Sequence, residues 1–452
     1  MSTGRPEAAH HRSVRYPMLG CLLMTCRIER VIGRRVWDSR GRPTVEVELH
    51  AKGCIGRGIA PAGASRGSKE AIDLRDKGPE FGGFGVDSAV ANINREISTA
   101  IIGMDASDQA AIDRILIELD GTIDKSRLGG NAIVATSMAS LNLAAACSGI
   151  PLWRYLAGGN RVRLPLPQVQ IFGGGAHAGT RIDIQDLMVM PVGAHSFDQA
   201  MAWVAEVYRA AGNLLTGMNR LAGVADEGGW WPAFESNEEA LQVLTRSIEK
   251  AGFAHDQVAI ALDIAASQLG SAGHYHLKLD QREYNTAEWA DVILGWIRRY
   301  PIVSIEDPFS EDDSEGVQTL TRAVGDFVQI VGDDSLVTNA ARITEAAAQK
   351  HGNAALLKPN QAGTITETFA ALEAALSMGF GTIVSARSGE TEDVSIAHLA
   401  VGWNAGQLKV GSFARSERMA KWNECLRIEA EMGSNAAFAG RAVLPLQNTR
   451  VS

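Results

Sequence analysis

Beyond about residue 164, short apolar runs alternate with amphipathic stretches, and each run ends in a charged or polar cluster. Within Thr286 to Arg299 and Thr364 to Met378 the apolar residues recur at three- and four-residue spacing, which predicts helices between the runs. Strands that alternate with helices in this way predict a β/α barrel. The predicted strands are VAIALD (258–263), PIVSIED (301–307), VQIVGDD (328–334), AALLKPN (354–360), GTIVSARS (381–388) and QLKVGS (407–412).

The preceding part of the chain has a different pattern. Apolar and polar residues alternate from Val45 to Leu49 and the alternation stops at Gly53, which predicts hairpin strands within 27–60 with DSRGRP (38–43) as a turn. Helical spacing follows over 88–102 and over 131–149, where Gly149 is expected to cap the helix. We therefore predict an α/β protein with an α+β capping domain over 24–160 and a β/α barrel over 161–452. Residues 1–23 are polar and patternless at first and are expected to be an upstream extension.

Composition agrees with two globular domains. The 452 residues are 46% hydrophobic and 21% charged, and one core rarely grows beyond about 250–300 residues. The 43 Lys and Arg against 52 Asp and Glu give a net charge of -9, which argues against nucleic acid or an anionic membrane as partner. The apolar run from Met18 to Met24 is too short to cross a bilayer.

The cysteines favour a reducing, cytoplasmic protein. They are odd in number and form no C-x-x-C pair of the zinc or redox kind. They are Cys21, Cys26, Cys54, Cys147 and Cys425.

Charged residues stand at the carboxyl ends of the predicted barrel strands, where such folds place their sites. Three carboxylates together favour a hard divalent cation, with Mg²⁺ the first choice, and the basic residues suit a small anionic substrate. Any one carboxylate could instead be an ordinary helix N-cap. The combination on consecutive strands favours a site formed by Asp263, Glu306, Asp333, Lys358, Arg387 and Lys409.

Three further segments carry polar chemistry. DEGGWWP (226–232) places a carboxylate before a glycine turn, and GGGAHAG (173–179) places His177 in a loop. HYH (274–276) is more typical of a solvated surface pair than of a metal site.

Taken in order, the motifs DSRG-PTVEVE, GAS-GS-EA-LRD, DEGG, SIEDPF, GDD--VTN, LLK-NQ-GT-TET, RSGETED and ARSER--K-N resemble those of enolase from about Arg27 to Leu446. The resemblance implies an enolase-type fold and Mg²⁺-dependent phosphopyruvate hydratase chemistry. Members of that superfamily use a lysine base together with Mg²⁺. This mechanism is implied by the resemblance and does not follow from the spacing of the residues.

Residue by residue, the resemblance assigns two Mg²⁺ ions to each site. Asp263, Glu306 and Asp333 would hold the first, which also binds the substrate carboxylate. Ser65, in the GAS-GS lid, would hold the second, which arrives with the substrate.

The resemblance also assigns the elimination chemistry. Lys358 would remove the proton α to the carboxylate, and Glu227 would protonate the departing hydroxyl. The other implied roles are assistance to the substrate carboxylate by Lys409, phosphate binding by Arg387 and Ser388, and completion of the wall by Gln185 and His177.

The chain departs from enolase at several of these positions. Enolases carry Glu at Asp186, His at Ala386 and Asn at Gly173, and the lid has Ala62 and Arg66 in place of Ser and Thr. Smaller side chains and an added lid arginine would suit a larger anionic head group.

This pattern favours a phospho- or phosphono-carboxylate substrate such as that of the enolase-like carboxyphosphonoenolpyruvate synthases of phosphinothricin-type pathways. The alternatives are an ordinary glycolytic hydratase and a catalytically weak binding protein. A homodimer or larger homo-oligomer is expected.

Overall fold

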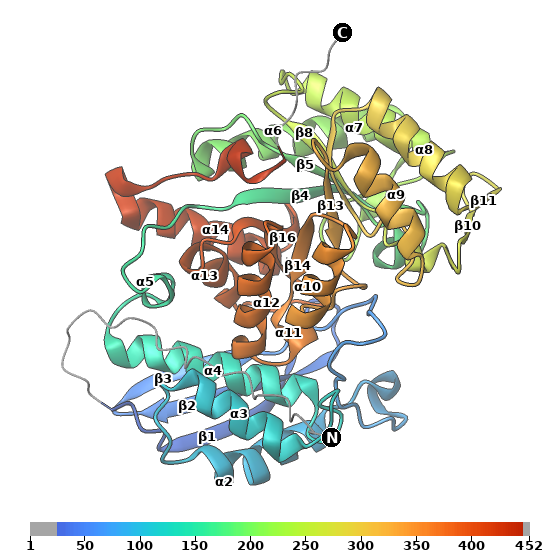
Figure 1. The fold of residues 1–452 in the computed structure, drawn as a ribbon. Coiled ribbons are helices and arrows are strands. Elements are labelled where there is room, and N and C mark those ends of the chain that lie inside the picture. Colours follow the sequence, from blue (N-terminus) through green and yellow to red (C-terminus); the bar gives the residue numbers. More distant parts are fainter. Residues whose placement is uncertain (1–24, 446–452) are drawn as a thin grey trace, which may run out of the picture.

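The computed structural model describes residues 25–445 of the 452-residue chain. The extension predicted over 1–23 lies outside the described residues. Figure 1 shows a lower part, formed by the N-terminal elements, beneath a larger barrel.

A three-stranded antiparallel sheet forms the core of the N-terminal part, as the alternating pattern predicts. Its strands are β1 (Arg30–Trp37), β2 (Pro43–Ala51) and β3 (Cys54–Ile59). Helix α4 (Gly130–Ser148) packs on β2 and β3 and ends at Gly149, whose positive φ of 65° confirms the predicted cap. Helices α3 (Gln109–Asp120) and α5 (Leu152–Ala157) also belong to this part.

The helix predicted over 88–102 is divided. It consists of α1 (Asp87–Asn92), a π-helical turn η2 (Ile93–Ile97) and α2 (Ser98–Ile101). The side chain of Asn94 donates to the carbonyl of Gly33 at 2.9 Å and accepts from its N–H at 2.8 Å. This pairing draws the helix onto β1, where the widened turn occurs.

Helix α4 is the one helix among the described residues that is long and apolar enough to cross a membrane. Of its most apolar window, 83% is buried inside the protein. It is therefore the central core helix of the N-terminal part.

The barrel is closed. Within residues 25–445 its strands follow the ring order β4 (Leu166–Gly173), β5 (Asp186–Met190), β8 (Ala259–Asp263), β12 (Ile302–Glu306), β13 (Gln329–Gly332), β14 (Ala354–Leu357), β15 (Gly381–Ser385) and β16 (Gly406–Ser412), and β16 pairs with β4. All the strands predicted from the apolar runs are present.

One strand runs against the others. β5 pairs antiparallel with both β4 and β8, and it was not among the strands predicted from the apolar runs. Because β5 is reversed, its first residue, Asp186, lies beside Asp263 at the carboxyl end of β8. The reversal therefore brings a strand start to the face where the other strands end.

Helices cover the outside of the barrel (Figure 1). They include both predicted helices, now α8 and α12. Their bounds are α6 (Phe197–Gly217), α7 (Asn237–Lys250), α8 (Thr286–Arg299), α9 (Ser314–Val324), α10 (Ala340–Ala348), α12 (Ile365–Ser377), α13 (Ser395–Gly402) and α14 (Ser416–Met432). The short α11 (Pro359–Ala362) instead follows the carboxyl end of β14 and contacts α4. Short strands β6 (Leu221–Val224) and β7 (Trp230–Pro232) extend the barrel sheet, and β9 (Gly270–Ser271), β10 (His274–Leu277) and β11 (Arg282–Asn285) form a small surface sheet.

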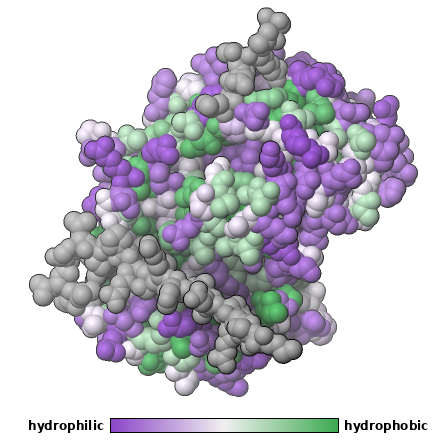
Figure 2. All heavy atoms as spheres, viewed as in Figure 1, coloured by the Kyte–Doolittle hydropathy of each residue, from purple (hydrophilic) through white to green (hydrophobic). Residues whose placement is uncertain are grey.

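The described surface in this view is largely hydrophilic. Figure 2 shows a pale green patch over α10 and α12, both rich in alanine. The two helices contact each other, and α12 packs on β14 and β15 of the barrel.

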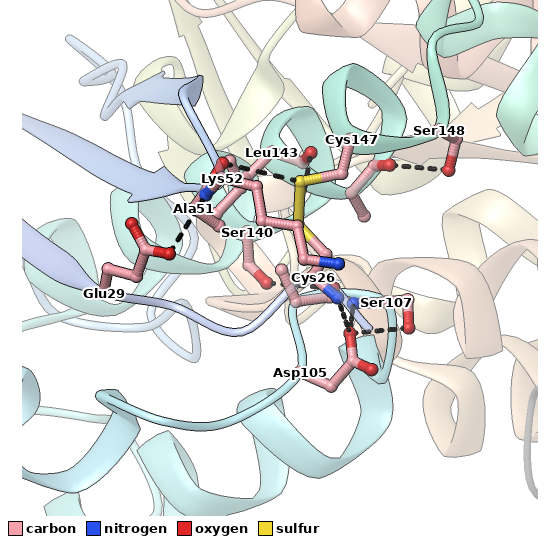
Figure 3. The surroundings of a disulfide bond; sticks show 12 residues. Cys26, Glu29, Ala51, Lys52, Asp105, Ser107, Ser140, Leu143, Cys147 and Ser148 are labelled. Carbon is pink, nitrogen blue, oxygen red and sulfur yellow. Dashed lines mark hydrogen bonds between the residues drawn. A yellow bond between two sulfur atoms is a disulfide. The ribbon is translucent and has the colours of Figure 1, made fainter. Parts of the chain in front are cut away.

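A disulfide joins Cys26, just before β1, to Cys147 in the last turn of α4 (Figure 3). Their Cα atoms lie 6.1 Å apart although 121 residues separate them in the chain. The cysteine spacing did not predict this pair, because only the packing of α4 beside the start of β1 brings the two together. The bridge encloses the whole three-stranded sheet in one covalent loop.

Loss of this bridge is expected to destabilise the N-terminal part. For a loop of 121 residues, the chain-entropy relation predicts about 4–5 kcal/mol. Denaturant unfolding with and without reductant should show a lower midpoint on reduction of the wild type and no effect of reductant on Cys26→Ser/Cys147→Ser. Cys54→Ser, which removes a free cysteine of β3, is the matched control. A reductant effect that persists in the double variant would contradict this expectation.

A buried carboxylate joins the two parts of the protein. Asp113 of α3 accepts from Ser137 Oγ of α4 at 2.6 Å and from the backbone N–H of Thr366 in α12 at 2.8 Å. Burial raises the pKa of Asp113 to about 6, although these hydrogen bonds oppose the shift. Between about pH 4 and pH 6, the folded protein therefore keeps a proton on Asp113 that the unfolded chain would release.

Because the folded pKa is raised, the stability linked to Asp113 is present at low pH and is lost as the pH rises through about 6. The shift from 3.8 to about 6 corresponds to a loss of about 3 kcal/mol in total, of which about 2 kcal/mol falls between pH 4.5 and pH 7.5. Urea unfolding of the wild type and Asp113→Asn across this range should show their difference changing by that amount. A pH-independent difference would contradict the assignment.

Candidate active site

The carboxyl ends of the barrel strands surround a small cavity of about 20 Å³, room for about one water molecule. The lid segment from Gly63 to Ser65 covers it from the N-terminal part. A substrate can enter only if side chains in this wall move. The predicted site residues that line the cavity are Ser65, Gln185, Asp186, Glu227, Asp263, Lys358, Arg387, Ser388 and Lys409.

Lys409 of β16 lies among carboxylates. Its Nζ is 2.7 Å from Asp263 Oδ2, 2.8 Å from Glu306 Oε2 and 3.3 Å from Asp186 Oδ2. Burial alone would lower the pKa of Lys409, but the charges of Asp263 and Glu306 outweigh it and hold the pKa well above its ordinary value. The ammonium group therefore supplies the positive charge that these carboxylates need.

Lys358, which follows β14, has the same relation to Asp333. Its Nζ forms a short ion pair with Asp333 Oδ2, and Gln361 donates to the other carboxylate oxygen at 2.8 Å. Burial lowers the pKa of Lys358, but the charge of Asp333 raises it further, so the net shift is upward. The upward shift follows from the pairing of Lys358 with the carboxylate of Asp333.

The carboxylates fit a hard divalent cation. Within residues 25–445, Glu306 Oε1 is a buried oxygen with no hydrogen-bond donor, and burial together with the charge of Asp263 raises the pKa of Glu306 well above its ordinary value. The raised pKa means that the negative charge on this carboxyl group is costly to form. A cation bound to its free oxygen would stabilise that charge. Oxygen ligands without His or Cys suit Mg²⁺, which Asp263, Glu306 and Asp333 would hold.

A second acidic group overlaps with this set. Oxygens of Asp307, Asp333 and Asp334 lie within 4.8 Å of one another, the one such group found in the described part of the chain. Asp307 also accepts from the backbone N–H groups of Asp333 and Asp334, each at 2.9 Å. Asp307 therefore orients the loop that carries the predicted ligand Asp333.

Arg387, after β15, is held by the lid. It donates to Glu70 Oε2 at 2.9 Å, to Asn360 Oδ1 at 3.1 Å and to the carbonyl of Ser65 at 2.9 Å. Ser388 Oγ accepts from the N–H of Ala64 at 2.6 Å. The predicted phosphate-binding pair thus contacts the lid directly.

Arg66 does not line the cavity. It donates to the carbonyl of Ala71 at 2.8 Å, lies 3.9 Å from Glu70, and its side chain is 38% exposed. Ala62 is also outside the cavity lining, and its backbone pairs with Gly389. Neither lid substitution adds a group to the cavity in this state.

Gly173 does not open space, contrary to the prediction. A Cβ placed there would lie 2.6 Å from Cβ of Ala225 and 3.5 Å from the amide of Gln170. The turn that carries Glu227 packs against this position, so the volume of the missing side chain is already filled. Of the small residues singled out in the sequence, Ala386 alone lines the cavity in the part that the structure describes.

Two predicted wall residues lie at the start of β5. Gln185 donates to Asp263 Oδ2 at 3.0 Å, and Asp186 follows it. Glu227 lies across the cavity in the turn between β6 and β7, and its carbonyl accepts from the N–H of Ser412 at 2.9 Å. The backbone of His177 belongs to the short helix η3 (Gly175–Ala178), and its side chain lies outside the described residues.

Four polar contacts of the site were not predicted from the sequence: Glu70 and Asn360 on Arg387, Gln361 on Asp333, and Arg40 on Ser388 at 3.2 Å. All four stand inside the quoted motifs. Their position in the motifs could have indicated a role in the site. Their contacts could not be predicted, because the partner residues are distant in sequence.

This fold and site define a class: β/α-barrel enzymes whose site lies at the carboxyl ends of the strands, here with carboxylates, lysines and an arginine gathered there. The family model for the N-terminal domain of enolase matches residues 28–156, and that for the C-terminal TIM barrel domain of enolase matches residues 161–446. Enolase 1 of Desulfitobacterium hafniense (strain Y51) is 48% identical over 422 residues, covering 92% of this chain and 97% of that protein. The chain belongs to the enolase family and is a hydro-lyase.

Proposed function

We propose that this protein dehydrates 2-phosphoglycerate to phosphoenolpyruvate with Mg²⁺. The observation that carries the proposal is the placement of Lys358 and Glu227 on one cavity, together with a cation-binding set of carboxylates. The family membership and the 48% identity to an enolase support the same activity.

The elimination requires one base and one acid. Lys358 first takes the proton from C2 of the substrate, and the electron pair of that C–H bond is delocalised onto the substrate carboxylate. In the second step this electron pair forms the C2–C3 double bond. The C3–O bond breaks as Glu227 gives its proton to the hydroxyl, which leaves as water. When bound, Mg²⁺ supplies positive charge that stabilises the charge developing on the substrate carboxylate.

Substrate binding uses the remaining residues. Lys409 assists the substrate carboxylate, Arg387 and Ser388 hold the phosphate, and Ser65 holds the second Mg²⁺. Gln185, Asp186 and His177 complete the wall. These roles rest on the motifs and on the positions that line the cavity.

A substrate with a carboxyl group on phosphorus is the second candidate, favoured by one observation, the short side chain of Ala386 in the cavity wall. The two other features that favoured a larger head group do not support it in the structure. Arg66 contacts Glu70 and Ala71, and Gly173 leaves no free volume. We therefore favour 2-phosphoglycerate.

Turnover of both compounds, followed by ultraviolet absorbance of the enol product, tests this choice. We expect 2-phosphoglycerate to be the better substrate, a ratio unchanged in Arg66→Thr, and complete loss of activity in excess chelator. Faster turnover of the carboxylated analogue, with loss of that preference in Arg66→Thr, would reverse the assignment. Turnover that is insensitive to chelator would remove Mg²⁺ from it.

We also propose a homo-oligomer in the cytoplasm, with the chain divided into domains at about residue 160. Light scattering tests the oligomeric state. The Cys26–Cys147 disulfide is unusual for a reducing compartment, so a cytoplasmic location predicts that both thiols are alkylated in intact cells, as read by mass spectrometry. Protection of both cysteines from alkylation would contradict that location.

A further inference from the structure

Gln170 connects the two halves of the site although it does not line the cavity. It is buried on β4, and its side-chain N–H group donates to Asp186 Oδ1 in a short hydrogen bond. The side-chain oxygen Oε1 of Gln170 accepts from the backbone N–H of Gly229 at 2.9 Å. One amide therefore joins Asp186 at the start of β5 to the turn that carries Glu227.

A bulge in β4 produces this arrangement. The pairing of β4 with β5 shifts register between Gln170 and Phe172, so that Gly173 lies opposite Asp186. A bulge re-aims side chains near active sites. Here Gln170 reaches Asp186 even though its own partner in the register is Met188.

The turn that carries Glu227 packs closely against this amide. A Cβ on Gly229 would lie 2.3 Å from Gln170 Oε1, so the turn approaches as closely as glycine permits. Gly228, beside it, has a positive φ of 91°, which also favours glycine. The distance between Asp186 and the turn is thus spanned by the full length of a glutamine side chain.

We propose that Gln170 is a positioning residue for the elimination. It holds Asp186, whose carboxylate is 3.3 Å from Lys409 Nζ, in a fixed relation to the turn of Glu227. The long side chain of Gln170 reaches the short side chain of Asp186, so the two side chains together span the gap between the turn and the start of β5. This inference rests on the proposed function, because it assigns Gln170 to the step in which Glu227 acts.

The lengths can be exchanged between the two residues. Gln170→Asn shortens the amide, which then cannot reach both Asp186 and the N–H of Gly229. Asp186→Glu lengthens the carboxylate, which then overlaps with the amide of Gln170. The double variant Gln170→Asn/Asp186→Glu keeps the total length, so each change should relieve the other.

The test is a double-mutant cycle on the full-length protein with Mg²⁺ and the substrate that the wild type turns over. Each single variant is expected to lower kcat about 10- to 100-fold with KM changed less than about threefold, and the double variant to recover at least about tenfold over the product of the single effects. Exchange of the α-proton with solvent deuterium should stay within about threefold of wild type, because Lys358 is not affected.

The matched control is Gln168→Asn. Gln168 is also buried on β4, two residues before Gln170, and donates to Gln407 at 3.0 Å away from Asp186. It should show no selective loss of elimination. A midpoint of thermal unfolding that falls in each single variant and recovers in the double variant provides a readout without substrate.

Failure of this inference and failure of the proposed function are distinguishable. Absence of wild-type activity on 2-phosphoglycerate would count against the proposed function alone. The coupling between Gln170 and Asp186 could still be measured by thermal unfolding or with another substrate that the wild type turns over. Single effects that multiply without coupling, equal loss of exchange and elimination, or a Gln168→Asn variant as impaired as Gln170→Asn would overturn the positioning role.

Discussion

Replacing Lys358 with alanine is expected to lower kcat for dehydration by about 10²–10⁴-fold, the range for loss of a positioned general base. Lys358 lines the cavity and is buried, and the proposed mechanism has no other base on this side of the substrate. The effect should therefore fall on kcat, with a smaller change in KM.

The decisive measurement is exchange of the substrate α-proton with solvent deuterium, which reports proton removal before elimination. Lys358→Ala should abolish exchange and product formation together. Lys250→Ala, at the exposed end of α7, is the matched control and should retain both. Exchange that continues in Lys358→Ala would show that another group removes the proton. Thermal unfolding distinguishes a folded variant from one destabilised by the unpaired Asp333.

Glu227→Gln is expected to separate the two halves of the reaction. A glutamine has nearly the same shape but cannot give a proton, so the departing hydroxyl loses its acid. Product formation should fall by about 10²–10⁴-fold while α-proton exchange continues. The turn should persist, since its backbone bond to Ser412 does not involve the side chain.

Exchange and product formation are measured on the same sample over time. Glu283→Gln, an exposed change on β11, is the control and should alter neither. Equal losses in exchange and product would mean that Glu227 acts in proton removal as well, and the division of labour between Glu227 and Lys358 would be wrong.

Local sequence patterns determined most of the architecture. The apolar run that ends at Asp263 became β8, and the periodic stretch from Thr286 to Arg299 became α8, because a buried strand and an amphipathic helix each bury a face set by their own residues. For the same reason, the charged residues at the run ends met at one edge of the barrel. The motifs were specific enough to indicate the enolase family, which the comparisons confirm.

Other features depended on contacts between distant residues. No local pattern shows that β5 is reversed, that Cys26 meets Cys147, or that Gly173 is packed against Ala225. Each depends on how elements pack, and packing is decided by the summed burial of the whole chain rather than by any segment.

The charge state of the site was likewise decided by the tertiary structure. The sequence placed Lys409 and Arg66 near an anionic substrate, yet Lys409 pairs with the carboxylates and Arg66 with the lid. The buried charge of Lys409 is stabilised by a partner of opposite charge, and which partner is within reach depends on three-dimensional position. The sequence by itself therefore determined which groups this enolase-family protein brings to its site, and only the folded structure decided which of them contact one another.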